Sequence, residues 1–352
     1  MDFPVAAEIR AALVDRVERD LGYPVWLHTP GGALGEPFAA RMAGRYGWRP
    51  DPGHVREFSD INQALQVVLD AATRPGDRVA LHTPAYHPFL GTLEEMERPL
   101  LPVPMVPAGD GWGFDLDRLD AEVASGGCRA LLLVNPQNPT GRAFTRAELT
   151  GLAELAERHD LLVLSDEIHA DLTYAPHEHI PFASLSPEAA ARTVTLTSAT
   201  KAFNLAGLRC AVAHIGAAEV RAALAARPRH LGGEVGVMGV IATAAAWAEG
   251  DAWLADVLAV LDRNRRLLAD ALPREVGYRV PDATYLAWLD VGALGLGEDP
   301  GKFFADQARV LVNSGPAFGP GGDGFVRLNF ATSGAVLAEI LDRVATALEH
   351  RG

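Results

Sequence analysis

The sequence predicts an α/β protein in which helices cover a large, mostly parallel central sheet, and three observations lead to this fold class. Short β-rich runs in the middle of the chain are nearly all apolar, which is typical of parallel strands buried on both faces. A helical pattern separates two of these runs and makes a strand–helix–strand unit. The 352 residues are more than one hydrophobic core usually organises, so we expect two domains.

Four strands and one intervening helix are predicted in the central region. The strands are Arg78–His82, Ala130–Val134, Leu161–Ser165 and Thr193–Thr197. The helix extends from Thr145 to His159, because Thr145 and Glu148 form a capping-box signature. Apolar residues follow at helical spacing, namely Leu149, Leu152, Ala153 and Ala156.

The last third of the chain has a different pattern, which predicts a smaller α+β domain. Two helices and two short strands are expected there, at Ala252–Leu272, Gly334–Glu349, Tyr285–Leu289 and Phe325–Phe330. An N-terminal helix at Val5–Leu21 is expected to join this domain. The small domain would then be discontinuous, with residues 1–29 and 241–352, and the large domain would comprise residues 30–240.

Charge and composition exclude several classes of function. A net charge of −14 argues against nucleic acid or an anionic membrane as a partner, because both require a basic face. No uninterrupted apolar run is long enough for a membrane span. Cys128 and Cys210 lie beside apolar runs without metal-ligand spacing, which favours buried free thiols in a reducing compartment. Residues 1–10 do not resemble a signal peptide, so we expect a cytoplasmic protein.

The strongest candidate for chemistry is Lys201, in the segment S-A-T-K-A-F-N-L-A-G-L-R that follows the strand Thr193–Thr197. An amine at the end of a buried strand loses hydration, which lowers its pKa and makes it a better nucleophile toward an aldehyde. The hydroxyls of Ser198 and Thr200 and the guanidinium of Arg209 suit a phosphate dianion. Taken alone, however, the lysine is more typical of a surface turn.

Two further motifs follow strands of the same predicted sheet. N-P-Q-N-P-T-G holds Asn138 in a rigid turn, where its amide can donate to a phenolate-type oxygen, although a plain turn is the alternative. In S-D-E-I-H, Asp166 can keep a pyridine nitrogen protonated, and we prefer it to Glu167 because it directly follows the apolar strand. His169 can order Asp166 or face a bound ring, and Glu167 is interpreted as structural.

Two weaker features complete the candidate site. The segment Ser59–Asn62 precedes a helical stretch, so the backbone amides of Asp60 and Ile61 can bind an anion, although Asp60 can equally be an N-cap alone. Tyr86 follows the strand Arg78–His82 and can stack on a flat heterocycle, although ordinary packing is the more common role of such a tyrosine.

The order and spacing of the N-P-x-N-P-T-G, S-D-E-I-H and S-A-T-K motifs resemble those of the fold-type I enzymes that depend on pyridoxal 5′-phosphate (PLP). These enzymes form the class I/II aminotransferase superfamily and have an aspartate aminotransferase-like fold. Within it, the chain resembles the cystathionine β-lyase-like C–S lyases of the maltose-regulon modulator type. The finer resemblance covers essentially the whole chain and rests on M-D-F-P-V, R-Y-G-W, Y-H-P-F, D-E-I-H-A-D-L, K-A-F-N-L-A-G-L and F-V-R-L-N-F, which begin at residues 1, 45, 86, 166, 201 and 325.

The resemblance implies a role for each candidate residue. Lys201 would bind the cofactor as a Schiff base and then transfer protons, with Tyr86 as the second catalytic residue stacked on the ring. Asp166 would pair with the pyridine nitrogen, Asn138 would bond the 3-oxygen of the cofactor, and His169 would occupy a place where many aminotransferases have tyrosine. The phosphate would be held by Ser198, Arg209 and the amides of Asp60 and Ile61.

The resemblance also implies how the substrate and a second subunit are bound. Arg327, together with Asn138, would bind the α-carboxylate of a small amino-acid substrate. Tyr23 would reach the phosphate of the partner subunit, which implies a homodimer with shared active sites. Related lyases usually have a few dozen residues before M-D-F-P that help to cover the substrate side, so we expect either a start codon downstream of the usual one or a more open site with altered specificity. S-D-I-N at residues 59–62 replaces a turn that often contains glycine.

The resulting hypothesis is an α,β-elimination from an S-substituted L-cysteine that yields a thiol, pyruvate and ammonia. One alternative is a class I/II aminotransferase or another PLP-dependent biosynthetic enzyme, including decarboxylating variants, because no single residue forces elimination. The other alternative is a regulatory protein that binds PLP with little catalysis.

Overall fold

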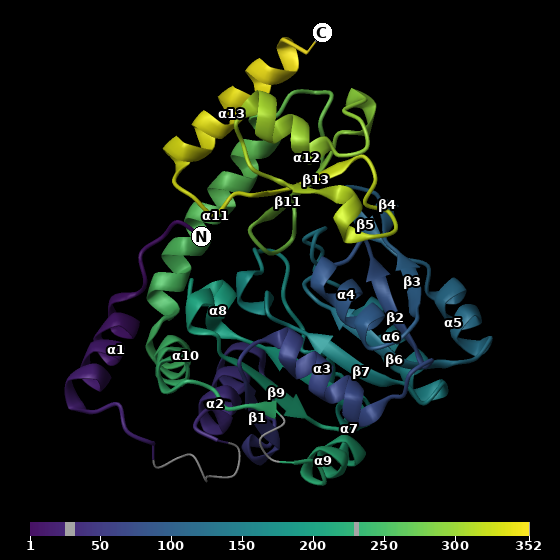
Figure 1. Ribbon diagram of the computed structural model, residues 1–352, viewed down its shortest axis with the longest axis vertical. Helices are drawn as coiled ribbons and strands as arrows, with labels where there is room; N and C mark the ends of the chain where they lie inside the picture. Colours follow the sequence, from purple (N-terminus) through teal and green to yellow (C-terminus); the bar gives the residue numbers. More distant parts are fainter. Residues whose placement is uncertain (25–31, 229–231, 352) are drawn as a thin grey trace.

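The computed structural model describes residues 1–24, 32–228 and 232–351. In this part of the chain the main sheet has seven strands in the order β1-β9-β8-β7-β6-β2-β3 (Figure 1). They are β1 (Val55–Phe58), β2 (Arg78–Thr83), β3 (Leu100–Pro104), β6 (Cys128–Val134), β7 (Leu162–Asp166), β8 (Thr193–Thr197) and β9 (Ala211–Ile215). Strands β3, β2, β6, β7 and β8 are parallel, whereas β9 and β1 pair antiparallel at one edge. The prediction of a mostly parallel sheet is confirmed.

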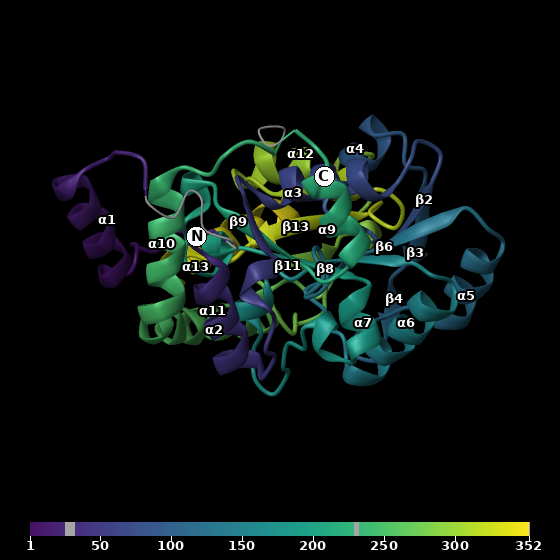
Figure 2. The same cartoon turned by 90° about the horizontal axis from the view of Figure 1, so that it is seen from below.

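Helices cover both faces of this sheet (Figure 2). One face carries α3 (Ile61–Ala72), α4 (His87–Glu95) and α9 (Ala218–Ala225), and the other carries α5 (Leu116–Ala124), α6 (Arg146–Arg158) and α7 (Pro187–Ala191). Side chains of β6 alternate between the two cores: Leu132 and Val134 face α3 and α4, whereas Leu131 and Leu133 face α5 and α6. Burial on both faces explains why these strands are almost entirely apolar.

The predicted helix of the strand–helix–strand unit is α6, and its start has the expected capping box. The Oγ1 atom of Thr145 accepts from the backbone N–H of Glu148, and Oε2 of Glu148 accepts from the N–H of Thr145 at 2.6 Å. Such a cap typically contributes about 1 kcal/mol, because it satisfies N–H groups that the helix leaves unpaired. The apolar stripe of α6, with Leu149 and Leu152, is fully buried against the sheet.

A second sheet, with the order β10-β11-β13-β12, lies in the C-terminal part of the chain. Its antiparallel strands are β10 (Gly277–Tyr278), β11 (Leu286–Asp290), β12 (Asn313–Ser314) and β13 (Phe325–Asn329). The long helices are α11 (Asp251–Ala271) and α13 (Gly334–Glu349). The predicted C-terminal helices and strands are therefore confirmed to within a residue at each end. A third core joins this sheet to α2 (Gly35–Tyr46) and α10 (Val237–Glu249).

The N-terminal helix α1 (Ala7–Arg19) packs beside α10 at the side of the molecule (Figures 1 and 2). Other short elements include α8 (Ala199–Ala202), α12 (Pro300–Phe303), β4 (Val106–Ala108) and β5 (Gly111–Gly113). The division into domains stays a prediction, and its first boundary, at residues 29 and 30, lies outside the described residues.

Cys128 and Cys210 are buried and unpaired, as expected. Among the described residues, no helix is both long and apolar enough to cross a membrane.

Candidate active site

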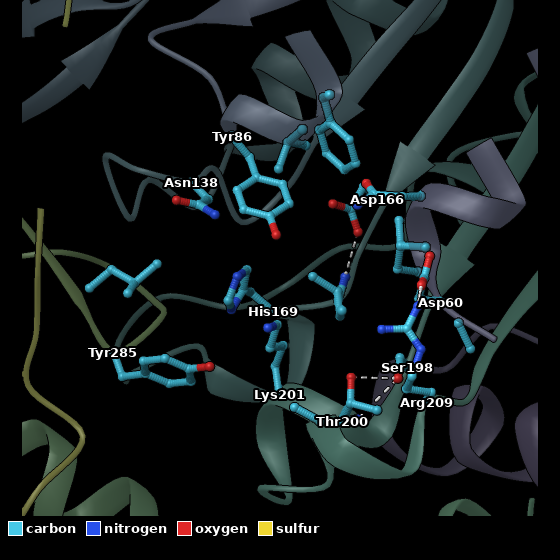
Figure 3. Close-up of a pocket in the computed structure, with 18 of the residues that line it drawn as sticks. Asp60, Tyr86, Asn138, Asp166, His169, Ser198, Thr200, Lys201, Arg209 and Tyr285 are labelled. Atoms are coloured by element: carbon cyan, nitrogen blue, oxygen red, sulfur yellow. Dashed lines mark hydrogen bonds and ion pairs between the residues drawn. The ribbon is translucent and has the colours of Figure 1, made fainter. Parts of the chain in front are cut away.

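A cavity of about 420 Å³ lies at the carboxyl ends of the parallel strands, between the main sheet and the second sheet (Figure 3). It contains all but one of the residues that the sequence predicted for the site: Asp60, Ile61, Tyr86, Asn138, Asp166, His169, Ser198, Lys201, Arg209 and Arg327. The exception is Tyr23, which is 90% exposed and lies outside this cavity.

The topology of the sheet explains why distant motifs meet. Parallel neighbours end at the same edge, so the residues that follow each strand gather there. Tyr86 follows β2 and precedes α4, and Asn138 follows β6. Asp166 is the last residue of β7, and Lys201 lies in the short helix α8 that follows β8. Arg327 comes from β13 of the second sheet, which closes the cavity from the other side.

Lys201 is held in the cavity by a helix that begins directly after β8. Ser198 is the N-cap of α8, and its Oγ atom accepts a hydrogen bond from the N–H of Thr200 at 3.0 Å. Burial lowers the pKa of Lys201, and the nearby charge of Arg327 lowers it further, whereas Asp166 opposes the shift. The amine is therefore more easily deprotonated than an exposed lysine, which favours nucleophilic attack.

Asp166 is a buried carboxyl group that needs a cationic partner. Burial raises its pKa to about 7, and the N–H of Ile168, which donates to Oδ1 at 3.1 Å, opposes the shift. Glu167 turns away from the cavity, where it accepts from Ser165 Oγ at 2.9 Å and contacts His179 Nε2 at 3.0 Å. The choice of Asp166 over Glu167 therefore agrees with the geometry.

His169 faces the cavity and is electrically neutral. Its ring lies edge-on to that of Tyr285, with 6.0 Å between the centroids. Burial lowers the pKa of His169 to about 3, with further contributions from the positive charges of Lys201 and Arg327. Its ring lines the cavity, and no hydrogen bond joins it to Asp166 within the described chain; its role toward a bound ring stays a prediction.

Arg327 is fixed by contacts on three sides. Its Nη1 atom donates to Oδ1 of Asn138 and its Nη2 atom to Oδ1 of Asn313, both at 2.8 Å. The guanidinium lies over the ring of Phe318, 4.8 Å from its centroid. Burial lowers the pKa of Arg327 to about 10, so the group remains cationic at neutral pH. Such an oriented guanidinium suits a carboxylate.

The opposite end of the cavity carries donors for an anion. Ser198 Oγ lies 2.8 Å from Thr200 Oγ1 and donates its single proton to the carbonyl of Cys210 at 2.5 Å, so this hydroxyl would turn from that carbonyl to donate to an anion. The N-terminus of α3 opens here, and Oδ1 of Asp60 caps it by accepting from Gln63 N–H at 2.8 Å. The N-cap role of Asp60 is thus confirmed. The Oδ2 atom of Asp60 forms an ion pair with Arg209. The guanidinium that was predicted to bind a phosphate therefore contacts a carboxylate in this structure.

Sequence reasoning missed Tyr285 and Asn313, which both line the cavity. Tyr285 directly precedes β11, and Asn313 lies opposite Arg327 in the register of β12 and β13. Neither belongs to a motif after a strand of the parallel sheet. Their positions depend on the register of short antiparallel strands, and the sequence does not specify that register.

These groups fit one kind of cofactor. A buried amine suits an aldehyde, a buried carboxyl with a raised pKa suits a protonated ring nitrogen, and the donors around Ser198 suit a phosphate. The aromatic ring of Tyr86 lies across the cavity from Lys201 (Figure 3). The fold and the site together define a fold-type I enzyme whose cofactor is PLP.

The chain belongs to the aminotransferase class I and II family, whose model matches residues 58–344. It is 34% identical to cystathionine beta-lyase PatB of Bacillus subtilis, over 99% of this chain and 90% of the relative. A crystal structure of OvoB superimposes with a TM-score of 0.93 at 36% identity, over 100% of this chain and 91% of that one. The PLP-bound C-S lyase from Staphylococcus hominis has the same TM-score at 28% identity, over 100% and 92%.

Proposed function

We propose that this protein is a PLP-dependent carbon–sulfur lyase that releases a thiol, pyruvate and ammonia from an S-substituted L-cysteine. The observation that carries the proposal is the meeting of Lys201, Asp166, Asn138 and Arg327 in one cavity. The names of the relatives, which include cystathionine beta-lyases at 32% to 37% identity, support this reaction class.

PLP, when bound, withdraws electrons from the α-carbon of an amino acid and so makes its proton acidic. We propose that Lys201 Nζ binds the cofactor and then removes the Cα proton of the substrate, because its lowered pKa leaves it able to act as a base. Asp166 keeps the ring nitrogen protonated, since a cation beside the buried carboxyl relieves the cost of ionising it.

The remaining cofactor contacts follow from the positions of the other groups. Asn138 uses its amide oxygen for Arg327, which leaves Nδ2 to donate to the 3-oxygen of the cofactor. Tyr86 and His169 border the ring. Ser198, Arg209 and the backbone amides of Asp60 and Ile61 bind the phosphate, and Arg209 then exchanges its contact with Asp60 for a contact with the phosphate.

The substrate is oriented by Arg327. Its two Nη groups are held by Asn138 and Asn313, and the side chain presents a fixed cation to the α-carboxylate. Binding of the carboxylate would thereby hold Cα near Lys201 Nζ. Proton removal would then occur between two groups that are already positioned, which lowers the entropic cost of the step.

Transamination is the second candidate function, and the match of the aminotransferase family model favours it. In that reaction Lys201 would deliver the proton that it holds without loss of a β-substituent. Transamination requires a 2-oxo acid acceptor and leaves the Cβ–S bond intact, whereas elimination needs no acceptor and breaks this bond.

The test is product analysis with the PLP-loaded protein. Incubation with cystathionine and simple S-alkyl cysteines should give equal amounts of thiol and pyruvate without an added 2-oxo acid. Lys201→Ala should abolish both the products and the covalent retention of PLP after borohydride reduction. Turnover only with an acceptor would support the aminotransferase, and bound PLP without turnover of any amino acid would support a regulatory protein.

We also propose a homodimer in which Tyr23 reaches the phosphate of the partner subunit. Tyr23 is 90% exposed, and the apolar side chains of Val14, Val17 and Leu21 beside it are exposed as well, which favours coverage by another chain. A mixture of the inactive variants Tyr23→Ala and Lys201→Ala should recover activity, since one site in a mixed dimer would be intact.

The two unpaired buried cysteines support a cytoplasmic location.

A further inference from the structure

Tyr285 is placed in the cavity by a strained backbone. The preceding residue, Thr284, has a φ of 72°, a region that β-branched residues rarely adopt. A residue in this conformation is destabilised and persists only where the surroundings impose it. Because strained residues cluster at functional sites, the position of the adjacent Tyr285 suggests a functional role.

Each polar atom of Thr284, namely its backbone nitrogen, its carbonyl oxygen and Oγ1, takes part in a hydrogen bond. Its N–H donates to the carbonyl of Leu172 at 3.0 Å, and its carbonyl accepts from the hydroxyl of Tyr174 at 2.5 Å. Its Oγ1 atom accepts from the N–H of Leu286 at 3.2 Å. Thr284 is completely buried, so these contacts are protected from water.

The same segment is attached to the loops that carry the cofactor-binding residues. Ala283 N–H donates to the carbonyl of Gly141, in the turn that contains Asn138, at 2.9 Å. Leu172 follows His169 in the loop after β7. Tyr285 is therefore fixed relative to both loops and not merely to its own sheet.

The hydroxyl of Tyr285 is directed into the cavity. Figure 3 shows it pointing from the side of the cavity toward the end of the Lys201 side chain. The side chain is 8% exposed, and its hydroxyl has no hydrogen-bond partner among the described residues. Burial raises the pKa of Tyr285 to about 12, so the hydroxyl keeps its proton and is available as a neutral hydrogen-bond donor at physiological pH.

The two tyrosines occupy different parts of the cavity. Figure 3 shows Tyr86 on the side of Asp166 and Tyr285 on the side away from it. The ring of Tyr285 lies beside that of His169, with 6.0 Å between the centroids. Tyr285 is therefore distant from the carboxyl that would face the ring nitrogen and lies toward the part of the cavity where the substrate would bind.

We propose that the hydroxyl of Tyr285 donates a hydrogen bond to the departing sulfur and stabilises the negative charge that develops as the Cβ–S bond breaks. This inference rests on the proposed lyase function. The Cα–H electron pair becomes the Cα=Cβ bond, and the Cβ–S pair leaves with the sulfur. The proton that Lys201 took from Cα then neutralises the thiolate, and Tyr285 keeps its own proton.

A hydrogen bond to this sulfur favours the transition state over the bound substrate. A thioether sulfur is a weak acceptor, whereas a developing thiolate is a strong one. The contact therefore strengthens as the bond breaks, which raises kcat without tightening substrate binding. Donors of this type typically contribute about 100- to 1,000-fold to kcat when charge develops on oxygen, and we expect about 10- to 100-fold for the more diffuse charge of sulfur.

The experiment compares the wild type with Tyr285→Phe on two substrates that differ only in the leaving group. S-alkyl cysteine expels a basic thiolate, whereas 3-chloro-L-alanine expels chloride, a very weak base that gains little from a donor. We expect kcat for the S-alkyl cysteine to fall about 10- to 100-fold with an unchanged KM, and that for 3-chloro-L-alanine to change less than about threefold. The matched control is Tyr278→Phe, whose hydroxyl donates to the carbonyl of Arg265 at 3.3 Å outside the cavity.

Two measurements without turnover complete the test. The affinity of the apoprotein for PLP and the thermal midpoint of Tyr285→Phe should match those of the wild type. An equal loss on both substrates, a loss of PLP affinity, or no loss on the S-alkyl cysteine would each overturn the role of Tyr285. If the wild type eliminates chloride but never a thiolate, the lyase proposal itself fails, which is a different result from the failure of Tyr285 alone.

Discussion

The guanidinium of Arg327 donates from Nη1 to the side-chain oxygen of Asn138, across 2.8 Å. The two residues are separated by 189 positions: Asn138 lies in the turn after β6 of the main sheet, and Arg327 lies in β13 of the second sheet. Because the amide oxygen of Asn138 is engaged, its nitrogen is oriented toward the centre of the cavity. One hydrogen bond thereby sets the orientation of both the group that we propose for the substrate carboxylate and the group that we propose for the 3-oxygen of the cofactor.

Arg327→Lys should weaken substrate binding severely. An ammonium group cannot contact Asn138, Asn313 and a carboxylate in the planar arrangement that the guanidinium provides. Loss of a charged hydrogen bond costs roughly 1.5 to 3 kcal/mol, so kcat/KM should fall about 10- to 150-fold, mainly through KM. Steady-state kinetics with an S-alkyl cysteine measure this effect, and Arg343→Lys on α13 serves as the exposed control. A change of less than threefold would rule out Arg327 as the carboxylate-binding group.

Asn313 is predicted to position Arg327, since it accepts the second Nη hydrogen bond at 2.8 Å. Asn313→Ala should raise KM by about 3- to 10-fold with little effect on kcat, because one neutral acceptor contributes about 1 kcal/mol. Asn313→Asp should be worse than Asn313→Ala, because a carboxylate beside Arg327 competes with that of the substrate. Kinetics of the two variants in parallel test this order, and the reverse order would contradict it.

The stability of the apoprotein should depend on pH through Asp166. Its pKa is about 7 in the folded protein against 3.8 for an ordinary aspartate, so between these pH values the native state binds a proton that the unfolded chain has lost. The free energy of unfolding should therefore fall as pH rises from about 4 to about 7, by at most about 4 kcal/mol from this group.

Asp166→Asn removes that ionisation, so the apoprotein of the variant should lose less stability over the same pH range. Its affinity for PLP should nevertheless fall about 10- to 100-fold, because the ring nitrogen loses its charged partner. Urea denaturation of both apoproteins at pH 4.5 and 7.5, with PLP titrations at pH 7.5, measures the two effects. Identical pH dependence in the two proteins would show that Asp166 is ionised throughout.

Arg41 should be important for stability. Its side chain is 2% exposed and bridges Asp171 at 3.0 Å and Asp251 at 2.6 Å, which joins α2 to the loop after β7 and to α11. Arg41→Met leaves Asp171 buried with fewer partners, and we expect a loss of about 3 kcal/mol in the free energy of unfolding. Arg118→Met, which removes the exposed pair with Glu122, should cost less than about 1 kcal/mol. Chemical denaturation of both variants tests the difference.

The positions of the catalytic motifs could be predicted because they depend on local pattern and on one rule of topology. Asn138, Asp166 and Lys201 each follow a strand that the sequence marks by continuous apolar character, and parallel strands end at one edge. The N-cap of α3 at Asp60 and the capping box of α6 were likewise readable from a few adjacent residues.

Other features depended on contacts between distant segments. The pair of Asp60 with Arg209 spans 149 residues, and no local pattern indicates it. Thr284 adopts its strained conformation only because Leu172 and Tyr174 hold it, so the orientation of Tyr285 could not be predicted from the sequence around it.

The sequence by itself determined the fold class, the order of the strands in the chain, and the lysine, carboxyl and amide that suit PLP. The tertiary structure decided how Arg327, Asn313 and Tyr285 come to line the cavity, because these residues lie on or directly before short antiparallel strands whose register is fixed by packing against the rest of the protein. Apolar periodicity is a local property, whereas the register and strain of such segments are set by distant contacts.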